Sequence, residues 1–295
     1  MKILRPCTTW STPVIDEERR PVPCALCGGG RFAPSLSCDG FSYVKCAKCG
    51  LVQINPQPLA ESVKTRYGDN YLAYELENEE NFLTLQKLGL ADAGFYRLER
   101  DLMERRGPSQ DPPRVLDVGC ATGALLAFLR ERGWQVAGAE ISPSAEYARN
   151  TRGLDIRSMG VEDCRFPAGF FDLVLASHLI EHLNKPRAFL REVGRILCPG
   201  GRFMLTTPNI DGFQARVFGK RWRAAIFDHL YLFSLRTLKA MLKTEGFAIE
   251  GVYTWGGLAA GTAPPSLKRL ADKAAKRFGI GDVMLIKARN VNRPG

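Results

Sequence analysis

The chain has 295 residues, of which 45% are hydrophobic and 24% charged, with a formal net charge of +10 and nine cysteines. This length suffices for one large domain and one small one. Because no secretory apolar segment stands at the start and no run is long enough to span a membrane, we expect a cytoplasmic protein. In that reducing compartment, cysteines are expected as thiols or metal ligands rather than disulfides.

Two C-x2-C pairs stand near the start of the chain. Cys24 and Cys27 lie in CALCGGG, Cys46 and Cys49 lie in CAKCGLV, and each pair is followed by glycine. This spacing matches a zinc ribbon with four thiolate ligands. Because so short a segment has little core, the metal is expected to supply its folding energy. We therefore predict a structural Zn²⁺ and a small N-terminal zinc-ribbon domain over residues 1–57. Cys7 and Cys38 are expected to be ordinary thiols.

Residues 58–112 are predicted to be a helical linker or lid. Apolar residues recur at helical spacing over residues 81–106, and the tyrosines of RYGDNYLAY (Tyr67, Tyr71 and Tyr74) precede that stretch. Glycine and prolines over 107–113 then break the chain. Two interpretations are equally favoured for this helix, which either covers a bound cofactor or packs against a sheet edge.

A short apolar strand ending in VLDV leads into the loop GCATG, and a helical segment follows. Gly119 and Gly123, with small Ala121 between them, let the backbone approach a ligand where a Cβ would collide. About twenty residues further on, a second apolar strand ends in Glu140, whose carboxylate can accept hydrogen bonds from both hydroxyls of a ribose. An adenosine-containing ligand is predicted. The loop is a weaker match to a dinucleotide site, because it is GCATG rather than GxGxxG.

The remainder reads as alternating strands and helices, which predicts an α/β domain over residues 113–295. Further strands are expected over residues 154–159, 171–177, 201–209, 247–255 and 282–289, and helices over 143–153, 184–197 and 235–245. Ser142 is the expected N-cap of the first of these helices and Ser234 that of the last. The strand at 171–177 is a continuous apolar run of the kind that is buried in a parallel sheet.

Several of these motifs, in this order, resemble the class I S-adenosylmethionine-dependent methyltransferases: VLDVGCATG, the acid at 140, FDLVLASHLIEHL, CPGG and GRFMLTTPN. The resemblance covers roughly residues 113 to 290. It implies a Rossmann-like seven-stranded methyltransferase domain that binds S-adenosylmethionine. The cofactor-binding residues that it implies are Asp117, Gly119, Cys120, Ala121, Gly123, Glu140, Ile141, Val161, Glu162 and Ser177. Gly160 stands where the family often has Asp.

The chain has three histidines, and ligands of open α/β sheets bind at the carboxyl ends of the strands, where these histidines fall. His178, Glu181 and His182 follow the strand at 171–177 with i, i+3, i+4 spacing, so in a helical turn they share one face. His229 lies in the loop after the strand at 201–209, which can fold back over the same end.

Three roles for these residues stay open. His182 or His229 removes the acceptor's proton as a general base. Alternatively, the cluster binds a second divalent metal that lowers the pKa of the acceptor hydroxyl. SHLIEHL resembles the E-x-x-E-H metal site of ubiquinone-pathway O-methyltransferases and small-RNA 2′-O-methyltransferases, with His178 in place of the first Glu. In the third alternative, Glu181 and His182 only cap a helix.

The sequence says less about the methyl acceptor than about the cofactor. The segment 211–230 carries Arg216, Lys220, Arg221, Trp222 and Arg223, which could clamp an anionic acceptor or form an exposed amphipathic helix. SHLIEHL occupies the place where enzymes that methylate amino groups of bases carry (D/N/S)PP(Y/F/W). The ribbon plus this core resembles methyltransferases of sugar, cell-envelope glycan and natural-product pathways. We therefore expect O-methylation of a small-molecule or glycan-precursor substrate, with C-methylation of a sugar as an alternative.

A rival class is an RNA-modifying enzyme or a nucleic-acid-binding module, as a pI of 9.3 together with a ribbon would suit. The ribbon motif KCAKCG carries only two lysines, however, which argues against nucleic acid. The basic segment at 266–279 is amphipathic, with Leu267, Leu270, Ala271, Ala274 and Phe278 toward one side. Packing on the sheet is the favoured interpretation, and peripheral contact with an anionic membrane is the alternative. The sequence leaves the oligomeric state open.

Overall fold

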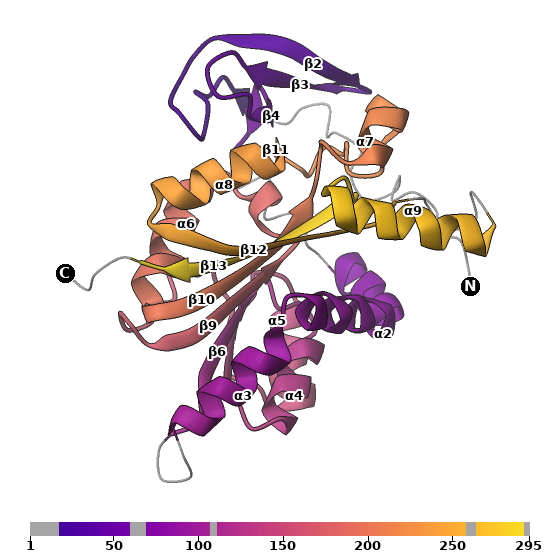
Figure 1. Cartoon of the computed structure of the whole chain (residues 1–295). Helices are drawn as coiled ribbons and strands as arrows, with labels where there is room; N and C mark the ends of the chain where they lie inside the picture. Colours follow the sequence, from indigo (N-terminus) through magenta and orange to yellow (C-terminus); the bar gives the residue numbers. More distant parts are fainter. Residues whose placement is uncertain (1–17, 60–68, 107–110, 258–263, 292–295) are drawn as a thin grey trace.

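The computed structural model describes residues 18–59, 69–106, 111–257 and 264–291. Its centre is a seven-stranded mixed sheet of order β12-β13-β10-β9-β6-β7-β8, with helices on both faces and a smaller sheet at one end (Figure 1). The bounds are β6 Arg114–Val118, β7 Gln135–Ala139, β8 Ile156–Arg157, β9 Phe171–Ser177, β10 Leu197–Pro208, β12 Phe247–Trp255 and β13 Val283–Asn290. The predicted α/β Rossmann-like fold is thereby confirmed.

Strand direction divides this sheet. The strands from β8 to β10 run parallel, whereas β13 is antiparallel to both β10 and β12. The carboxyl ends of β6, β7, β9 and β10 therefore meet at one edge, where the loops that follow them come together. The predicted strand over 154–159 is shorter than expected, since only Ile156–Arg157 pairs with β7.

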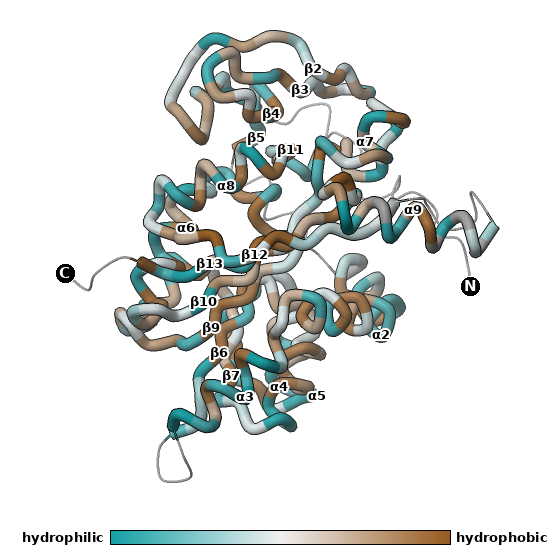
Figure 2. The backbone as a smooth tube through the Cα atoms, viewed as in Figure 1, coloured by the Kyte–Doolittle hydropathy of each residue, from teal (hydrophilic) through white to brown (hydrophobic). Residues whose placement is uncertain are grey.

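Hydrophobic residues colour the central strands β6 and β9 of the sheet (Figure 2). Neighbouring residues on β9 pack into two separate cores. Leu173 packs with the cluster under α2 Asp69–Asp92, α3 Phe95–Arg106 and α4, while Val174 packs with the cluster under α6 and α8. This alternation is the period-2 pattern of a strand that is buried on both faces. The helices are α4 Ala124–Glu131, α5 Ser144–Arg152, α6 Pro186–Ile196 and α8 Leu235–Thr244, close to the predicted ranges. As predicted, Ser234 caps α8, and its Oγ accepts from the Thr237 N–H at 3.2 Å.

The linker differs from its prediction. Two helices stand there, α2 Asp69–Asp92 and α3 Phe95–Arg106, because Gly94 takes a left-handed conformation with φ +72° and breaks the helix. The helix also begins earlier than expected, so Tyr71 and Tyr74 lie inside α2 rather than ahead of it, while Tyr67 lies outside the described residues. Apolar periodicity alone missed the polar first turns of α2.

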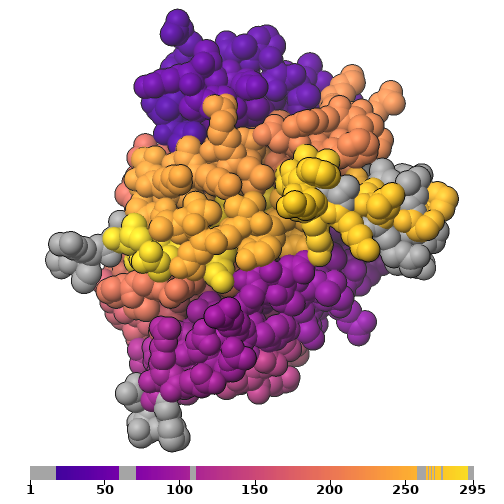
Figure 3. All heavy atoms as spheres, viewed as in Figure 1, coloured from indigo at the N-terminus to yellow at the C-terminus, as the bar shows by residue number. Residues whose placement is uncertain are grey.

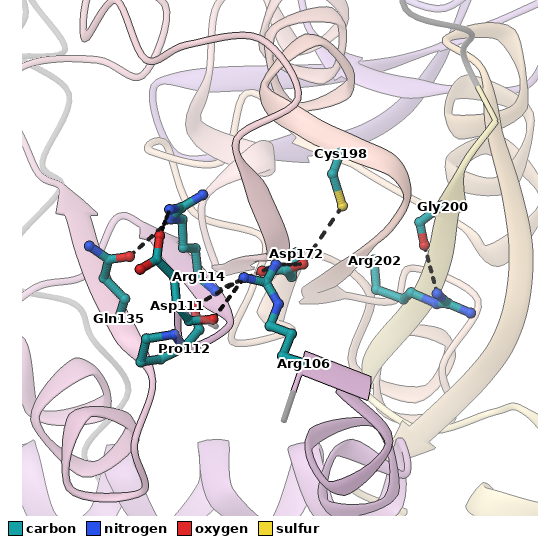
Figure 4. Close-up of polar contacts among 9 residues, drawn as sticks. All are labelled: Arg106, Asp111, Pro112, Arg114, Gln135, Asp172, Cys198, Gly200 and Arg202. Carbon is teal, nitrogen blue, oxygen red and sulfur yellow. Dashed lines mark hydrogen bonds and ion pairs between the residues drawn. The ribbon is translucent and has the colours of Figure 1, made fainter. Parts of the chain in front are cut away.

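The amino-terminal edge of the sheet is held by one carboxylate (Figure 4). Asp172, at the start of β9, accepts from Nη2 of Arg106 at 2.5 and 2.7 Å and from the backbone N–H of Arg114 at 2.7 Å. It therefore ties the end of α3 and the start of β6 to β9. Arg114 in turn reaches Asp111 at 2.8 Å and Gln135 at 2.9 Å.

Strand pairing joins the ribbon to the second half of the chain. Its strands are β1 Arg19–Arg20, β2 Phe32–Cys38, β3 Phe41–Cys46, β4 Val52–Ile54 and β5 Gln57–Pro58. Strand β11 Tyr231–Leu232, contributed by the second half of the chain, pairs with β4 and completes the four-stranded sheet β11-β4-β3-β2. In the space-filling view the ribbon sits directly on atoms of the later segments (Figure 3). The ribbon and the second half thus share one sheet.

The two basic segments in the second half of the chain form helices. The predicted clamp segment contains α7 Phe213–Phe218 and the 3-10 turn η2 Gly219–Arg221. Helix α9 Pro265–Phe278 packs through buried Ala275, but Leu270 is 64% and Phe278 72% exposed. The favoured interpretation, in which the apolar side of this segment packs on the sheet, is therefore wrong for these two residues. Among the described residues, no helix combines the length and apolar composition that crossing a bilayer requires.

Candidate active site and metal centre

The glycine loop after β6 turns through three left-handed residues. Gly119, Ala121 and Gly123 have φ of +73°, +49° and +76°. A Cβ added at Gly123 would stand 2.5 Å from a methyl of Leu154, so this glycine is required for packing of the turn. At Gly119 the nearest atom would be a Leu179 methyl at 3.4 Å. The loop therefore lies against the segment that carries the histidines.

Glu140 ends β7 and lies beside this loop. Its carboxylate is 8% exposed, accepts from the Ala121 N–H at 3.0 Å through Oε2, and accepts from the Ser142 N–H at 2.8 Å through Oε1. Each carboxylate oxygen can accept a further hydrogen bond. The group is thus fixed in place with capacity left for two hydroxyls. Ile141, the next residue, is 46% exposed.

Two more buried carboxyl groups lie near Glu140. Burial, aided by the charge of Glu140, raises the pKa of Asp117 to about 8. Burial and the same charge raise the pKa of Glu75 to about 7, although the Ser144 hydroxyl donates a hydrogen bond to it. A cationic ligand would relieve this repulsion. The chemistry of the site therefore fits the sulfonium and ammonium groups of S-adenosylmethionine.

Helix α2 contributes to this site from outside the predicted domain. Besides Glu75, its Glu79 accepts from Nη2 of Arg152 on α5 at 2.5 Å. Further along α2, a Cβ at Gly89 would lie 3.5 Å from Trp255 of β12. The helix therefore reaches the cofactor region with one half and packs on the sheet with the other, so both interpretations of the linker describe part of it.

Other predicted cofactor residues are placed differently. Cys120 and Val161 are 5% and 1% exposed and their side chains belong to packed clusters. Glu162 is exposed, and Ser177 is half-buried at the end of β9.

The histidine segment follows β9 and contains the 3-10 turn η1 Ile180–His182. Glu181 is 1% exposed and accepts from the Thr207 hydroxyl at 2.8 Å. The Nδ1 of exposed His178 lies 3.3 Å from the other carboxylate oxygen. Burial alone would raise the pKa of Glu181, but His178, with His182 and His229, lowers it to about 2. Glu181 is therefore ionised at neutral pH.

His182 and His229 meet edge to face, with ring centroids 4.7 Å apart. The Nδ1 of His229 lies 2.8 Å from the Ala224 carbonyl, which can only accept, so Nδ1 carries the proton and Nε2 keeps a lone pair. Burial lowers the pKa of His229 to about 3 and also lowers the pKa of His182. Both rings are neutral at pH 7.

The structure brings Glu181, His182 and His229 together, with one ligand atom of each within 4.8 Å of the others. His178 is not part of this group of three, although it lies beside Glu181. The arrangement suits proton transfer or a divalent cation, since imidazole nitrogen and carboxylate oxygen are common metal ligands.

The four ribbon cysteines converge. Their sulfur atoms lie within 4.8 Å of one another, with 3.4 Å between Cys24 and Cys49 and 3.5 Å between Cys27 and Cys46. A tetrahedral Zn²⁺ with Zn–S bonds of about 2.3 Å places sulfurs about 3.8 Å apart. Burial raises the pKa of Cys46, but hydrogen bonds from the Cys49 and Lys48 backbone outweigh it and lower the pKa to about 6. The cluster is compatible with a zinc ribbon.

Three residues near these sites were absent from the sequence-based prediction: Glu75, Thr207 and Tyr43. The hydroxyl of Tyr43, in ribbon strand β3, donates to the backbone carbonyls of Ile226 and His229 at 2.8 and 2.9 Å. For Thr207 a signal existed, because TTPN ends a strand at the ligand-binding edge. For Glu75 and Tyr43, distant in sequence from their partners, no local pattern indicates the contact.

Comparison with known proteins agrees with this geometry. A family model described as "Methyltransferase domain" matches residues 91–252, more than half of the chain. A ubiquinone biosynthesis O-methyltransferase of Xanthomonas oryzae pv. oryzae (strain PXO99A) is 36% identical over 103 residues, which cover 32% of this chain and 43% of that protein. Its counterpart in Xanthomonas axonopodis pv. citri (strain 306) is 31% identical over 153 residues, or 47% of this chain and 64% of that one. The chain thus spans less than two thirds of these relatives.

Among solved structures, a SAM-dependent methyltransferase from Archaeoglobus fulgidus superposes with a TM-score of 0.52 at 18% identity, covering 74% of this chain and 99% of that chain. At this identity the likeness concerns the fold. The family match, the fold and the site built from β6, β7 and β9 agree, and the chain belongs to the methyltransferase-domain family as a class I S-adenosylmethionine-dependent methyltransferase.

Proposed function

We propose that the chain transfers a methyl group from S-adenosylmethionine to a hydroxyl oxygen of a small, anionic acceptor. One arrangement carries the proposal: the neutral imidazoles of His182 and His229 and the ionised Glu181 lie at the ligand-binding edge of the sheet, beside the glycine loop. The two Xanthomonas relatives are named ubiquinone biosynthesis O-methyltransferases, and this supports oxygen as the acceptor atom. The resemblance of ribbon and core to sugar, glycan and natural-product enzymes supports that class of acceptor.

In this mechanism the chain mainly aligns the reactants. S-adenosylmethionine supplies, when bound, a methyl group that is already activated on sulfur. Asp117, Glu140 and the glycine loop would hold and orient the cofactor, so that the methyl group lies in line with the acceptor oxygen. We assign the general base to His182, because one of its ring nitrogens bonds the Asp228 backbone and the other can take the acceptor's proton. Glu181 then stabilises the imidazolium that forms.

A metal-assisted form of the same reaction is the second candidate, and the convergence of Glu181, His182 and His229 favours it. In that case these three residues would hold a divalent ion that lowers the pKa of the acceptor hydroxyl. The Nε2 lone pair of His229 is available for such a bond, because Nδ1–H donates to Ala224. Separately, we propose that the four ribbon thiolates hold a structural Zn²⁺, a role supported by their spacing.

The acceptor atom is tested with methyl-labelled S-adenosylmethionine and a panel of acceptors that carry hydroxyl, amino or activated carbon groups. The panel includes phenols, sugar phosphates and an RNA oligonucleotide. Fragmentation of the product by mass spectrometry should place the label on a hydroxyl oxygen of a small acceptor. Label on carbon, on nitrogen or on the RNA would replace the proposal with one of its rivals. Addition of Mn²⁺ or Zn²⁺ after dialysis, with ribbon zinc monitored, separates the base from the metal form.

A further inference from the structure

Two cavities lie where the ribbon meets the start of α6. Their volumes are about 450 and 290 Å³. They adjoin, since Val22, Gln57, Asn184 and Lys185 line both. Residues from both halves of the chain line each cavity. The residues that the proposed function assigns to catalysis and to cofactor binding line neither cavity.

The lining of these cavities is basic. Arg20, Lys185, Arg187 and Arg191 line one or the other, and no Asp or Glu is among the described residues that line them. Cys24, one of the four ribbon cysteines, also lines the larger cavity. Glu245 neutralises part of this charge, since it pairs with Arg187 and lies 3.6 Å from Nη1 of Arg191. An excess of positive charge remains at Arg20 and Lys185.

Helix α6 adds to this field. Its eleven residues begin at Pro186, and the N-cap residue Lys185 makes no side-chain cap bond. The first turn of a helix presents the positive end of the helix dipole, which favours a bound anion. Pro186, Arg187 and Ala188 of that turn line the larger cavity. Pro186 has no N–H and the Ala188 N–H donates to the Lys185 carbonyl at 3.0 Å, so the donor that this turn offers is the Arg187 N–H.

A residue that lines both cavities carries an unsatisfied donor. Gln57 is 2% exposed, and its Nε2 has no hydrogen-bond partner among the residues that the structure describes. The other amide atom, Oε1, lies 3.5 Å from the Tyr231 hydroxyl. A buried donor without a partner is destabilising. A ligand oxygen that reaches the Gln57 amide would satisfy it.

We propose that these cavities form the anion subsite of the acceptor and bind its phosphate or diphosphate group. The inference rests on the proposed function and names the acceptor's chemical class. Arg20 and Lys185, which have no ion pair among the described residues, favour a multiply charged anion over a single carboxylate. Two of the lining residues, Asn184 and Tyr231, each follow an imidazole, His182 or His229, by two positions, so the subsite and the imidazoles belong to the same two segments. The acceptor is a small phosphorylated compound whose reactive hydroxyl is close to its phosphate.

The test is calorimetry of inorganic pyrophosphate, inorganic phosphate and malonate with the full chain in the presence of S-adenosylhomocysteine. The variants are Lys185→Gln and Gln57→Met, and the matched control is Lys243→Gln, which removes an exposed charge of α8 that lines neither cavity. Pyrophosphate affinity should fall about tenfold in Lys185→Gln and Gln57→Met, because each removes a donor to a charged group. It should change less than twofold in Lys243→Gln.

Absence of pyrophosphate binding by the wild-type chain overturns the inference. So does an equal loss in Lys243→Gln, which would indicate a general basic surface, and so does malonate binding as tightly as pyrophosphate. If Gln57→Met fails to fold, Lys185→Gln decides alone. Binding of S-adenosylhomocysteine is measured on the same samples. If the wild-type chain does not bind S-adenosylhomocysteine, the result counts against the proposed function. If it binds S-adenosylhomocysteine but not pyrophosphate, the result counts only against this subsite.

Discussion

Glu140 is the residue on which cofactor recognition is expected to depend most. Its carboxylate is held by the N–H groups of Ala121 and Ser142 with acceptor capacity left for ribose hydroxyls. Hydrogen bonds to a charged group contribute about 1.5 to 3 kcal/mol each. Glu140→Ala should therefore weaken S-adenosylhomocysteine binding by about 10- to 100-fold in calorimetry. Glu146→Ala, an exposed glutamate of α5, is the matched control and should bind normally. Normal binding by Glu140→Ala would exclude the ribose role.

Cofactor binding should also depend on pH. The pKa of Glu75 is raised to about 7 and that of Asp117 to about 8, so both carboxyls lose protons between pH 6 and pH 9. The charges that appear attract cationic S-adenosylmethionine more than its neutral product. Affinity for S-adenosylmethionine should therefore rise about three- to tenfold from pH 6 to pH 8.5, and the product should respond less.

Calorimetry with both compounds at both pH values measures this difference. Glu75→Gln removes one titrating group and should flatten the response. A response that is identical for S-adenosylmethionine and S-adenosylhomocysteine would mean that these carboxyls do not face the sulfonium.

His182 is expected to act on the acceptor and not on the cofactor. Its pKa is lowered, so the ring is ready to accept a proton at neutral pH. General bases contribute about 10² to 10⁴ in rate. His182→Ala should lower kcat by about that factor while S-adenosylhomocysteine affinity is kept, and the acidic limb of the pH–rate profile should disappear. Unchanged turnover would remove His182 from the mechanism, and recovery with added Mn²⁺ would favour the metal form.

At the scale of elements, Asp172 joins α3, β6 and β9 (Figure 4). Asp172→Ala leaves the Arg106 guanidinium and the Arg114 N–H without this partner. Because Arg106 keeps partial access to water, we expect the free energy of unfolding to fall by about 2 to 3 kcal/mol in urea denaturation. Asp111→Ala breaks an ion pair whose carboxylate is 74% exposed, and it should cost less than about 0.5 kcal/mol. Equal costs would contradict the anchoring role of Asp172.

The elements also show what a sequence can and cannot predict. The strand, loop and acid from Val115 to Glu140 were predictable because each signal is local: a strand run, a left-handed glycine turn and a strand-end carboxylate. The four-cysteine spacing is local in the same sense. The break at Gly94 was missed, because apolar periodicity continues on both sides of it. The contact of Glu75 with Ser144 joins residues 69 positions apart, and only the assembled fold brings them together.

The histidine cluster was predictable only in part. The i, i+3 relation of His178 and Glu181 followed from the sequence, and the structure has it as a 3.3 Å pair. The approach of His229 was a hypothesis about a loop folding back. That loop is positioned by β11, which pairs with the ribbon, and by the Tyr43 hydroxyl. No sequence pattern specifies this pairing, because β11 has only two residues.

At the scale of the whole molecule, strand pairing and a hydrogen bond connect the ribbon to the loop that carries His229. Strand β4 follows directly from the second cysteine pair, and it pairs with β11 just after His229. Tyr43, three residues before Cys46, donates to the His229 carbonyl. A metal that fixes the cysteines would therefore also fix the loop that carries one of the imidazoles.

Removal of the ribbon metal should consequently reduce turnover without loss of the cofactor site. Cys46→Ser is expected to lose the single Zn²⁺ measured by plasma mass spectrometry, to melt at a lower temperature and to show a kcat at least tenfold lower, because β4 and Tyr43 no longer hold the His229 loop. Affinity for S-adenosylhomocysteine should be kept, since Glu140 and the glycine loop lie in another part of the fold. Cys38→Ser, in the same hairpin but outside the four-sulfur cluster, is the matched control and should retain both metal and turnover. Full turnover by a metal-free Cys46→Ser protein would show that the ribbon and the imidazoles are not coupled.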